Sequence, residues 1–134
     1  MLRHLALALS LLGPTAALAA EPELVTVRTE GTTTTLQAGE SGRLVLRLDP
    51  APGAHVNRDA PVKVELSSRQ ASFERPRLGL ADARLEDGGA RFEARFTPSA
   101  QGPISLQAAV SFYACTATTC ARQSRTVSVP VEVR

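Results

Sequence analysis

Hydrophobic and polar residues alternate in short runs along most of the chain. In residues 90–96, for example, Phe92, Ala94 and Phe96 are separated by charged residues. A period of two gives a strand one apolar face and one polar face, as antiparallel sheets with one buried face require. No window combines sustained helical periodicity with capping residues. The pattern predicts strands over residues 23–28, 42–48, 62–66, 90–96, 104–112 and 126–133.

Residues that favour turns separate these runs. Residues 49–53, 86–89 and 98–103 are rich in Pro, Gly and Asp, which supply fixed or positive φ and side-chain turns. Asp87-Gly88-Gly89 between two runs predicts a hairpin. About seven short strands in one chain predict an all-β fold, an immunoglobulin-like antiparallel β-sandwich, with a small barrel as the alternative. The antibody pattern of two distant cysteines and a tryptophan is absent, because the chain has no Trp.

Two local features predict edge strands. The run Thr32 to Thr35 favours an exposed edge strand over a glycosylated segment, because threonine has a high strand propensity. Pro130 lies inside the last run and cannot donate a ladder hydrogen bond. We therefore expect the last strand to lie at a sheet edge, or to be bulged, at Pro130.

The first 20 residues have the layout of a secretory signal peptide. Arg3 and His4 precede an uncharged apolar run over residues 5–12, and small residues follow at 17–20. The run is shorter than the roughly 20 apolar residues that span a bilayer. We expect cleavage after Ala19 or Ala20, which leaves a single domain over residues 21–134. The mature chain has no further segment that is apolar enough to span a membrane.

The charge balance gives no sign of a polyanionic partner such as nucleic acid. The chain has 15 Lys and Arg against 13 Asp and Glu. Because Arg3 leaves with the signal peptide, the mature net charge is +1. The charged residues are dispersed along the sequence, so we expect no basic patch for nucleic acid. Lys63 is the only lysine, a bias typical of GC-rich genomes, so the expected location is the bacterial periplasm or the exterior.

The only two cysteines, Cys115 and Cys120, lie where one strand-like run ends and the next begins. In an exported protein such a pair normally forms a disulfide. Facing positions of a hairpin bring Cα atoms close enough for this bond. A ring of six residues adds only about 2 kcal/mol in the loop-entropy model. A structural staple and a reducible redox pair are therefore both open.

Metal and hydrolytic chemistry have less support. Two thiolates with His55, the only histidine after cleavage, would suit copper(I). The mature chain has no methionine, and no further cysteine or histidine completes a tetrahedral zinc site. A lone histidine in a turn-rich segment is usually structural or solvated. No nucleophile elbow and no glycine-rich phosphate loop is present, so we expect no cofactor and no metal.

From about residue 40 to residue 133 the chain resembles the N-terminal domain of the thiol:disulfide interchange protein DsbD. The resemblance rests on residues 53–57 (GAHVN), 61–64 (PVKV), Tyr113 with the two cysteines, and 127–131 (VSVPV). It implies an immunoglobulin-like fold. It also implies that Cys115 and Cys120 accept electrons from a membrane partner and pass them to thioredoxin-like proteins, with Tyr113 packed beside them.

The chain departs from the family in three ways. The gap between its cysteines is slightly shorter, residues 83–89 lack the aromatic residue of the family's cap loop, and the membrane and thioredoxin domains are absent from this sequence. Arg122 and Arg125 follow Cys120 and would lower a thiol pKa if they pointed toward it. The functional hypothesis is thiol–disulfide exchange with protein partners, and the alternative is a non-catalytic binding or structural sandwich. The sequence does not distinguish which sulfur a partner attacks.

Overall fold

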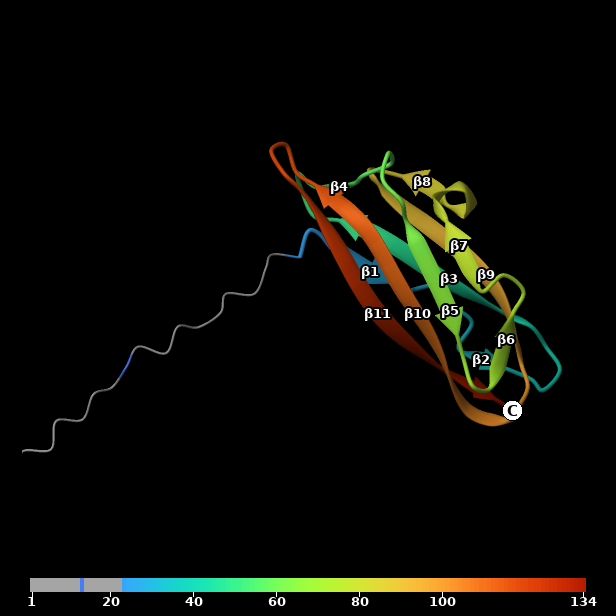
Figure 1. Cartoon of the computed structure of the whole chain (residues 1–134). Coiled ribbons are helices and arrows are strands. Elements are labelled where there is room, and N and C mark those ends of the chain that lie inside the picture. The colour runs from blue at the N-terminus through green and yellow to red at the C-terminus, as the bar shows by residue number, and fades with distance from the viewer. Residues whose placement is uncertain (1–12, 14–22) are drawn as a thin grey trace, which may run out of the picture.

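The chain folds into two facing β-sheets, as seen in a computed structural model that describes Gly13 and residues 23–134 (Figure 1). Sheet A has the order β1-β3-β9-β6, and β8 also pairs with β9. Its strands are β1 (Val25–Arg28), β3 (Gly42–Pro50), β6 (Ala71–Phe73), β8 (Arg84–Glu86) and β9 (Gly89–Pro98).

Sheet B has the order β2-β11-β10-β5-β7, and β4 also pairs with β10. All its pairings are antiparallel except β2 with β11. A single 3-10 turn (Leu80–Asp82) follows β7. The strands of sheet B are β2 (Thr35–Leu36), β4 (His55–Val56), β5 (Lys63–Ser67), β7 (Arg77–Gly79), β10 (Gly102–Cys115) and β11 (Cys120–Val133).

The predicted immunoglobulin-like β-sandwich is confirmed. Alternate residues of each long strand point between the sheets, where they leave water and stabilise the fold by about 25 cal/mol per Å² of apolar surface. The largest fully buried side chains come from both sheets: Phe92, Phe96, Phe112, Leu44, Leu46, Leu48 and Leu106. The core therefore spans the full width of the sandwich.

Each of the six predicted strands falls on an observed strand, but β11 begins earlier than predicted. It starts at Cys120, whereas the alternation begins at residue 126. The missed residues include Gln123 and Arg125, which occupy the inward-facing register of β11, so apolar alternation is absent there. Four strands of two or three residues, β4, β6, β7 and β8, were not predicted, and β2 was predicted only at Thr35. They are too short to show a period.

The structure tests both edge predictions. Beyond its pairing with β10, β11 pairs only with β2, and only at Glu132 and Val133. The prediction that Pro130 lies at a sheet edge is therefore confirmed. The threonine prediction was wrong for most of the run, because only Thr35 belongs to a strand. Thr32 instead bonds through its hydroxyl to the backbone of Val45, with its Oγ1 3.0 Å from the Val45 nitrogen.

The predicted hairpin at Asp87-Gly88-Gly89 joins β8 to β9. Asp87 and Gly88 both have positive φ, +43° and +78°, the conformation that tight two-residue hairpin turns require. The predicted signal peptide and its cleavage point lie outside the described residues, apart from Gly13. Among the helices of the described residues, none is long and apolar enough to cross a membrane.

Candidate functional site

The register of the β10–β11 hairpin places Cys115 directly opposite Cys120, and the two form a disulfide. Thr116 N–H donates to the Thr119 carbonyl at 2.7 Å. Hydrogen-bonded and non-hydrogen-bonded pairs alternate along antiparallel strands, so the cysteines occupy the adjacent non-hydrogen-bonded pair, where Cα atoms approach most closely. Their Cα atoms are 4.0 Å apart. The hairpin thus brings the two sulfurs together without any long-range contact.

The two cysteines differ in exposure. Cys115 is only 3% exposed, because β10 is an inner strand and β4 pairs with it at Ala114 and Cys115. Cys120 is exposed. It begins β11, whose far edge has no partner strand among the described residues until Glu132. The bridge therefore has one covered end and one end that faces solvent at an open sheet edge.

The tip of the hairpin is held by threonine hydroxyls. Thr116 Oγ1 accepts from the backbone N–H groups of Thr118 and Thr119 at 3.4 and 3.3 Å. It also lies 3.1 Å from Thr119 Oγ1. These local bonds satisfy backbone donors that the tight turn leaves without ladder partners. They fix the tip independently of the disulfide.

The outer face of sheet B carries the residues predicted as neighbours of the bridge. Tyr113 and Arg122 are paired in register, two residues from the cysteines on each strand. Because side chains alternate along a strand, both lie on the same face as the bridge. Arg122 also borders a shallow hollow of about 300 Å³ whose other walls include Lys63, Glu65 and Ser111.

Arg125 does not face the bridge. It lies an odd number of residues from Cys120, so its side chain points to the opposite face of β11. There its Nε is 3.6 Å from Oε1 of Glu23. Of the two arginines that sequence reasoning placed near the thiols, only Arg122 shares their face.

Sequence reasoning took His55 as a structural or solvated residue of a turn-rich segment, and the structure brings it beside the bridge. In β4 it pairs in register with Cys115, and Asn57 N–H donates to the Tyr113 carbonyl at 2.8 Å. The histidine itself is exposed. An imidazole is thus held next to the covered end of the bridge, on the outer face of the sheet.

The β8–β9 turn reaches the same end of the sandwich. Gly88 accepts a hydrogen bond from Val56 N–H at 2.8 Å. The turn that joins β8 to β9 therefore attaches to β4, the strand that pairs with Cys115. Residues 83–89 contain no aromatic side chain.

Gln123 was missed by sequence reasoning. It pairs with Phe112 on the core-facing side of the hairpin and is 9% exposed. Its Oε1 has no hydrogen-bond partner among the described residues. No apolar pattern signals it, because Arg125 occupies the same inward-facing register of β11. Within residues 23–134, no group of three or more His, Cys, Asp or Glu side chains is arranged to hold a metal ion.

Comparison with known proteins does not identify a family. No family model and no curated protein matches the chain. Domains 4 and 5 of the S-layer protein SbsC share 18% identity at a TM-score of 0.45; the match covers 86% of this chain but spans only 54% of that one. A Clostridium perfringens cohesin module shares 12% (TM-score 0.44, 82% of this chain and 96% of that one). A PapD-like domain of human CEP192 shares 13% (TM-score 0.40, 91% and 99%).

Proposed function

We propose that the chain is an exported thiol–disulfide exchange module of the DsbD N-terminal type, with Cys115 and Cys120 as its redox pair. The observation that carries this proposal is the one-sided exposure of the bridge. Cys120 meets solvent at an open edge, while Cys115 is covered by β4. Exchange requires a sulfur that an incoming thiolate can reach. Its partners are thioredoxin-like or membrane redox proteins, and the chain needs no cofactor.

The difference in exposure supports one order of events within this proposal. A partner thiolate attacks Sγ of Cys120, the S–S bond breaks, and Cys115 leaves as a thiolate that takes up a proton. The partner's second thiolate then attacks the partner's first sulfur, which is bonded to Cys120 in the mixed disulfide, and releases Cys120 as a thiolate. Two electrons and two protons pass to this chain, and the partner becomes oxidised. The reverse sequence delivers the electrons to a second partner.

Two neighbours assist in this scheme. His55 lies in register with Cys115, which places an imidazole beside the leaving thiolate. Arg122, on the same face as Cys120, adds positive charge that favours a thiolate. The hollow bordered by Arg122 and Lys63 gives a partner a polar surface that begins two residues from Cys120 along β11.

The reduction potential of the pair, measured against a thiol redox buffer, tests the proposal. We expect a value near −200 mV with the reduced form still folded, within the range of known exchange proteins. A value below about −300 mV, typical of structural disulfides, would overturn it.

Single-cysteine variants test the order of attack. Cys115→Ser leaves Cys120 free, and Cys120→Ser leaves Cys115 free. We expect the thiol of the first variant to react with 5,5′-dithiobis(2-nitrobenzoate) at least about tenfold faster, because only Cys120 is exposed. Equal rates in two folded variants would remove the assignment of Cys120 as the attacked residue.

The second candidate is a non-catalytic sandwich with an inert disulfide. It is favoured by the unbroken register of the hairpin, in which the cysteines are the last of fourteen consecutive pairs. A disulfide at this position links strands that are already paired. The measurement of the reduction potential decides between exchange and a structural disulfide, because a structural disulfide resists reduction.

A further inference from the structure

Four arginines that are far apart in sequence form a straight row across the outer face of sheet A. Arg28 pairs in register with Arg47, Arg47 with Arg91, and Arg91 with Arg84. The row therefore crosses β1, β3, β9 and β8. With neighbouring strands about 4.8 Å apart, it is about 14 Å long. We call these four residues the arginine row. Because these arginines are dispersed along the sequence, we expected no basic patch. The fold nevertheless brings them together on one face.

The arginine row is unfavourable in the free protein. Like charges directly opposite each other on adjacent strands repel and destabilise the sheet. Arg28 is neutralised by Asp49, with Nε and Oδ2 2.9 Å apart, and Arg91 by Glu93 at 3.0 Å. No acidic partner within 4.0 Å is found for Arg47 or Arg84 in the described part of the chain. Arg47 and Arg84 are therefore available to bind an anionic ligand.

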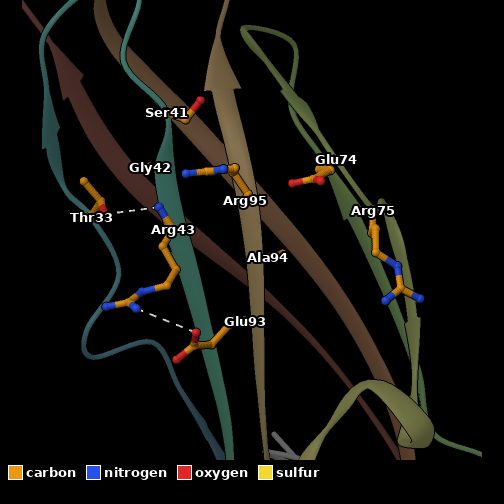
Figure 2. A pocket seen from close by; sticks show the side chains of 9 residues that line it. All are labelled: Thr33, Ser41, Gly42, Arg43, Glu74, Arg75, Glu93, Ala94 and Arg95. Carbon is orange, nitrogen blue, oxygen red and sulfur yellow. Dashed lines mark hydrogen bonds and ion pairs between the residues drawn. The ribbon is translucent and has the colours of Figure 1, made fainter.

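A second arginine pair lies four residues along the strands. Arg43 pairs in register with Arg95. Figure 2 shows the Arg43 side chain directed toward Glu93 and away from Arg95, and its Nη1 lies 3.7 Å from Glu93 Oε2. Hollows of about 240 and 580 Å³ meet at Glu93, and five arginines line them. These five are Arg43, Arg75, Arg84, Arg91 and Arg95.

The positions of the acidic residues indicate which shape of ligand fits the row. Asp49 lies two residues from Arg47 on β3, and Glu86 lies two residues from Arg84 on β8, so both carboxylates flank the row on one side. Glu93 flanks it on the other. Acidic residues thus border the row on both sides, and the pair Arg43 and Arg95 lies beyond Glu93. A linear polyanion laid along the row can reach Arg47 and Arg84, the two arginines without a described acidic partner, whereas a flat anionic membrane would bring its phosphates against all the bordering carboxylates.

We propose that the arginine row binds an acidic polysaccharide whose sulfate or carboxylate groups repeat at one or two strand spacings, about 5 or 10 Å. Guanidinium groups bind such oxyanions through paired, charge-assisted hydrogen bonds. The outward positions of β1, β3, β8 and β9 carry no aromatic residue, so the face lacks the stacking platform that single-stranded nucleic acid uses. This site lies on the opposite sheet from the disulfide and is independent of it.

Calorimetric titration of the chain with a heparin decasaccharide and with a polygalacturonate oligomer, at low salt, tests the proposal. We expect at least one of them to bind. The variant Arg47→Gln/Arg84→Gln should bind about tenfold more weakly. The matched control Arg69→Gln/Arg77→Gln removes the same charge from exposed positions outside the row and should change the affinity less than twofold.

Melting temperature gives a second readout. The polymer should raise the melting temperature of the unmodified chain and of the control, and should leave that of the row variant nearly unchanged. Absence of binding to both polymers, or equal weakening in row and control variants, would overturn the proposal. Tighter binding to phosphatidylglycerol vesicles than to either polymer would overturn it in favour of a membrane surface.

Discussion

Reduction of the Cys115–Cys120 bond should weaken the domain without unfolding it. The bond closes a ring of six residues at the end of a hairpin that is otherwise complete. In the loop-entropy model such a ring restricts the unfolded chain by about 7 cal/mol/K, or about 2 kcal/mol at 25 °C. A domain of this size normally has an unfolding free energy of about 5–15 kcal/mol. The reduced chain should therefore stay folded.

The same free energy fixes a difference in redox potential. Because folding and reduction form a closed cycle, a bond that stabilises the fold by about 2 kcal/mol is harder to reduce in the folded chain than in the unfolded one. At about 1.4 kcal/mol per 30 mV, the potential of the folded chain should be about 45 mV more negative. This shift is small enough for the potential to stay in the exchange range.

Urea unfolding of the oxidised and reduced chain measures the effect. With a slope near 2 kcal/mol/M, the midpoint should fall by about 1 M on reduction. The double variant Cys115→Ser/Cys120→Ser is the control, and its midpoint should not respond to reductant. A reduced chain that is unfolded without urea, or that loses more than about 5 kcal/mol, would refute the reasoning and identify the bond as an essential staple.

Three further outcomes follow from the structure. Arg47→Gln should raise the free energy of unfolding by about 0.2–1 kcal/mol at low salt, and the gain should vanish in 1 M salt, as urea unfolding would show. Gln123→Met should be neutral or stabilising by up to about 2 kcal/mol, because it removes a buried acceptor that has no described partner; a clear loss of thermal stability would indicate a bound water or partner group. The backbone N–H of Gly79, and then Arg75, hold the pKa of Asp82 below its ordinary value of 3.8. Its contribution to stability is therefore full above the ordinary pKa and is lost as pH falls through the lower folded pKa, and an NMR titration midpoint at or above 3.8 would contradict this.

The main architecture could be predicted because apolar and polar residues alternate along the long strands, and this alternation indicates which side of each strand is buried. Phe92, Ala94 and Phe96 alternate with charged residues because one face of β9 packs on the core and the other meets water. Gln123 and Arg125 break this rule, and the first half of β11 was missed for that reason. Alternation reveals a strand only where the inward positions are apolar.

The sites could be predicted only where they are local. The pairing of Cys115 with Cys120 follows from a short hairpin, so sequence spacing is sufficient. The position of His55 beside Cys115 depends on the pairing of β4 with β10, between segments that are distant in sequence, and no local pattern encodes it. The arginine row needs the registers of three strand pairs at once. Its members look like ordinary solvent-facing residues until the sheet is assembled.

The β10–β11 hairpin also has a consequence for how the chain folds. Its pairings link residues that are at most 31 positions apart, from Gly102 with Val133 down to Cys115 with Cys120. The ladder between β3 and β9, by contrast, joins segments more than 40 residues apart. Local hairpins form in microseconds, whereas non-local sheets are slow. The hairpin can thus form before sheet A exists, so an oxidant could close the disulfide from the two thiols while the chain is still folding.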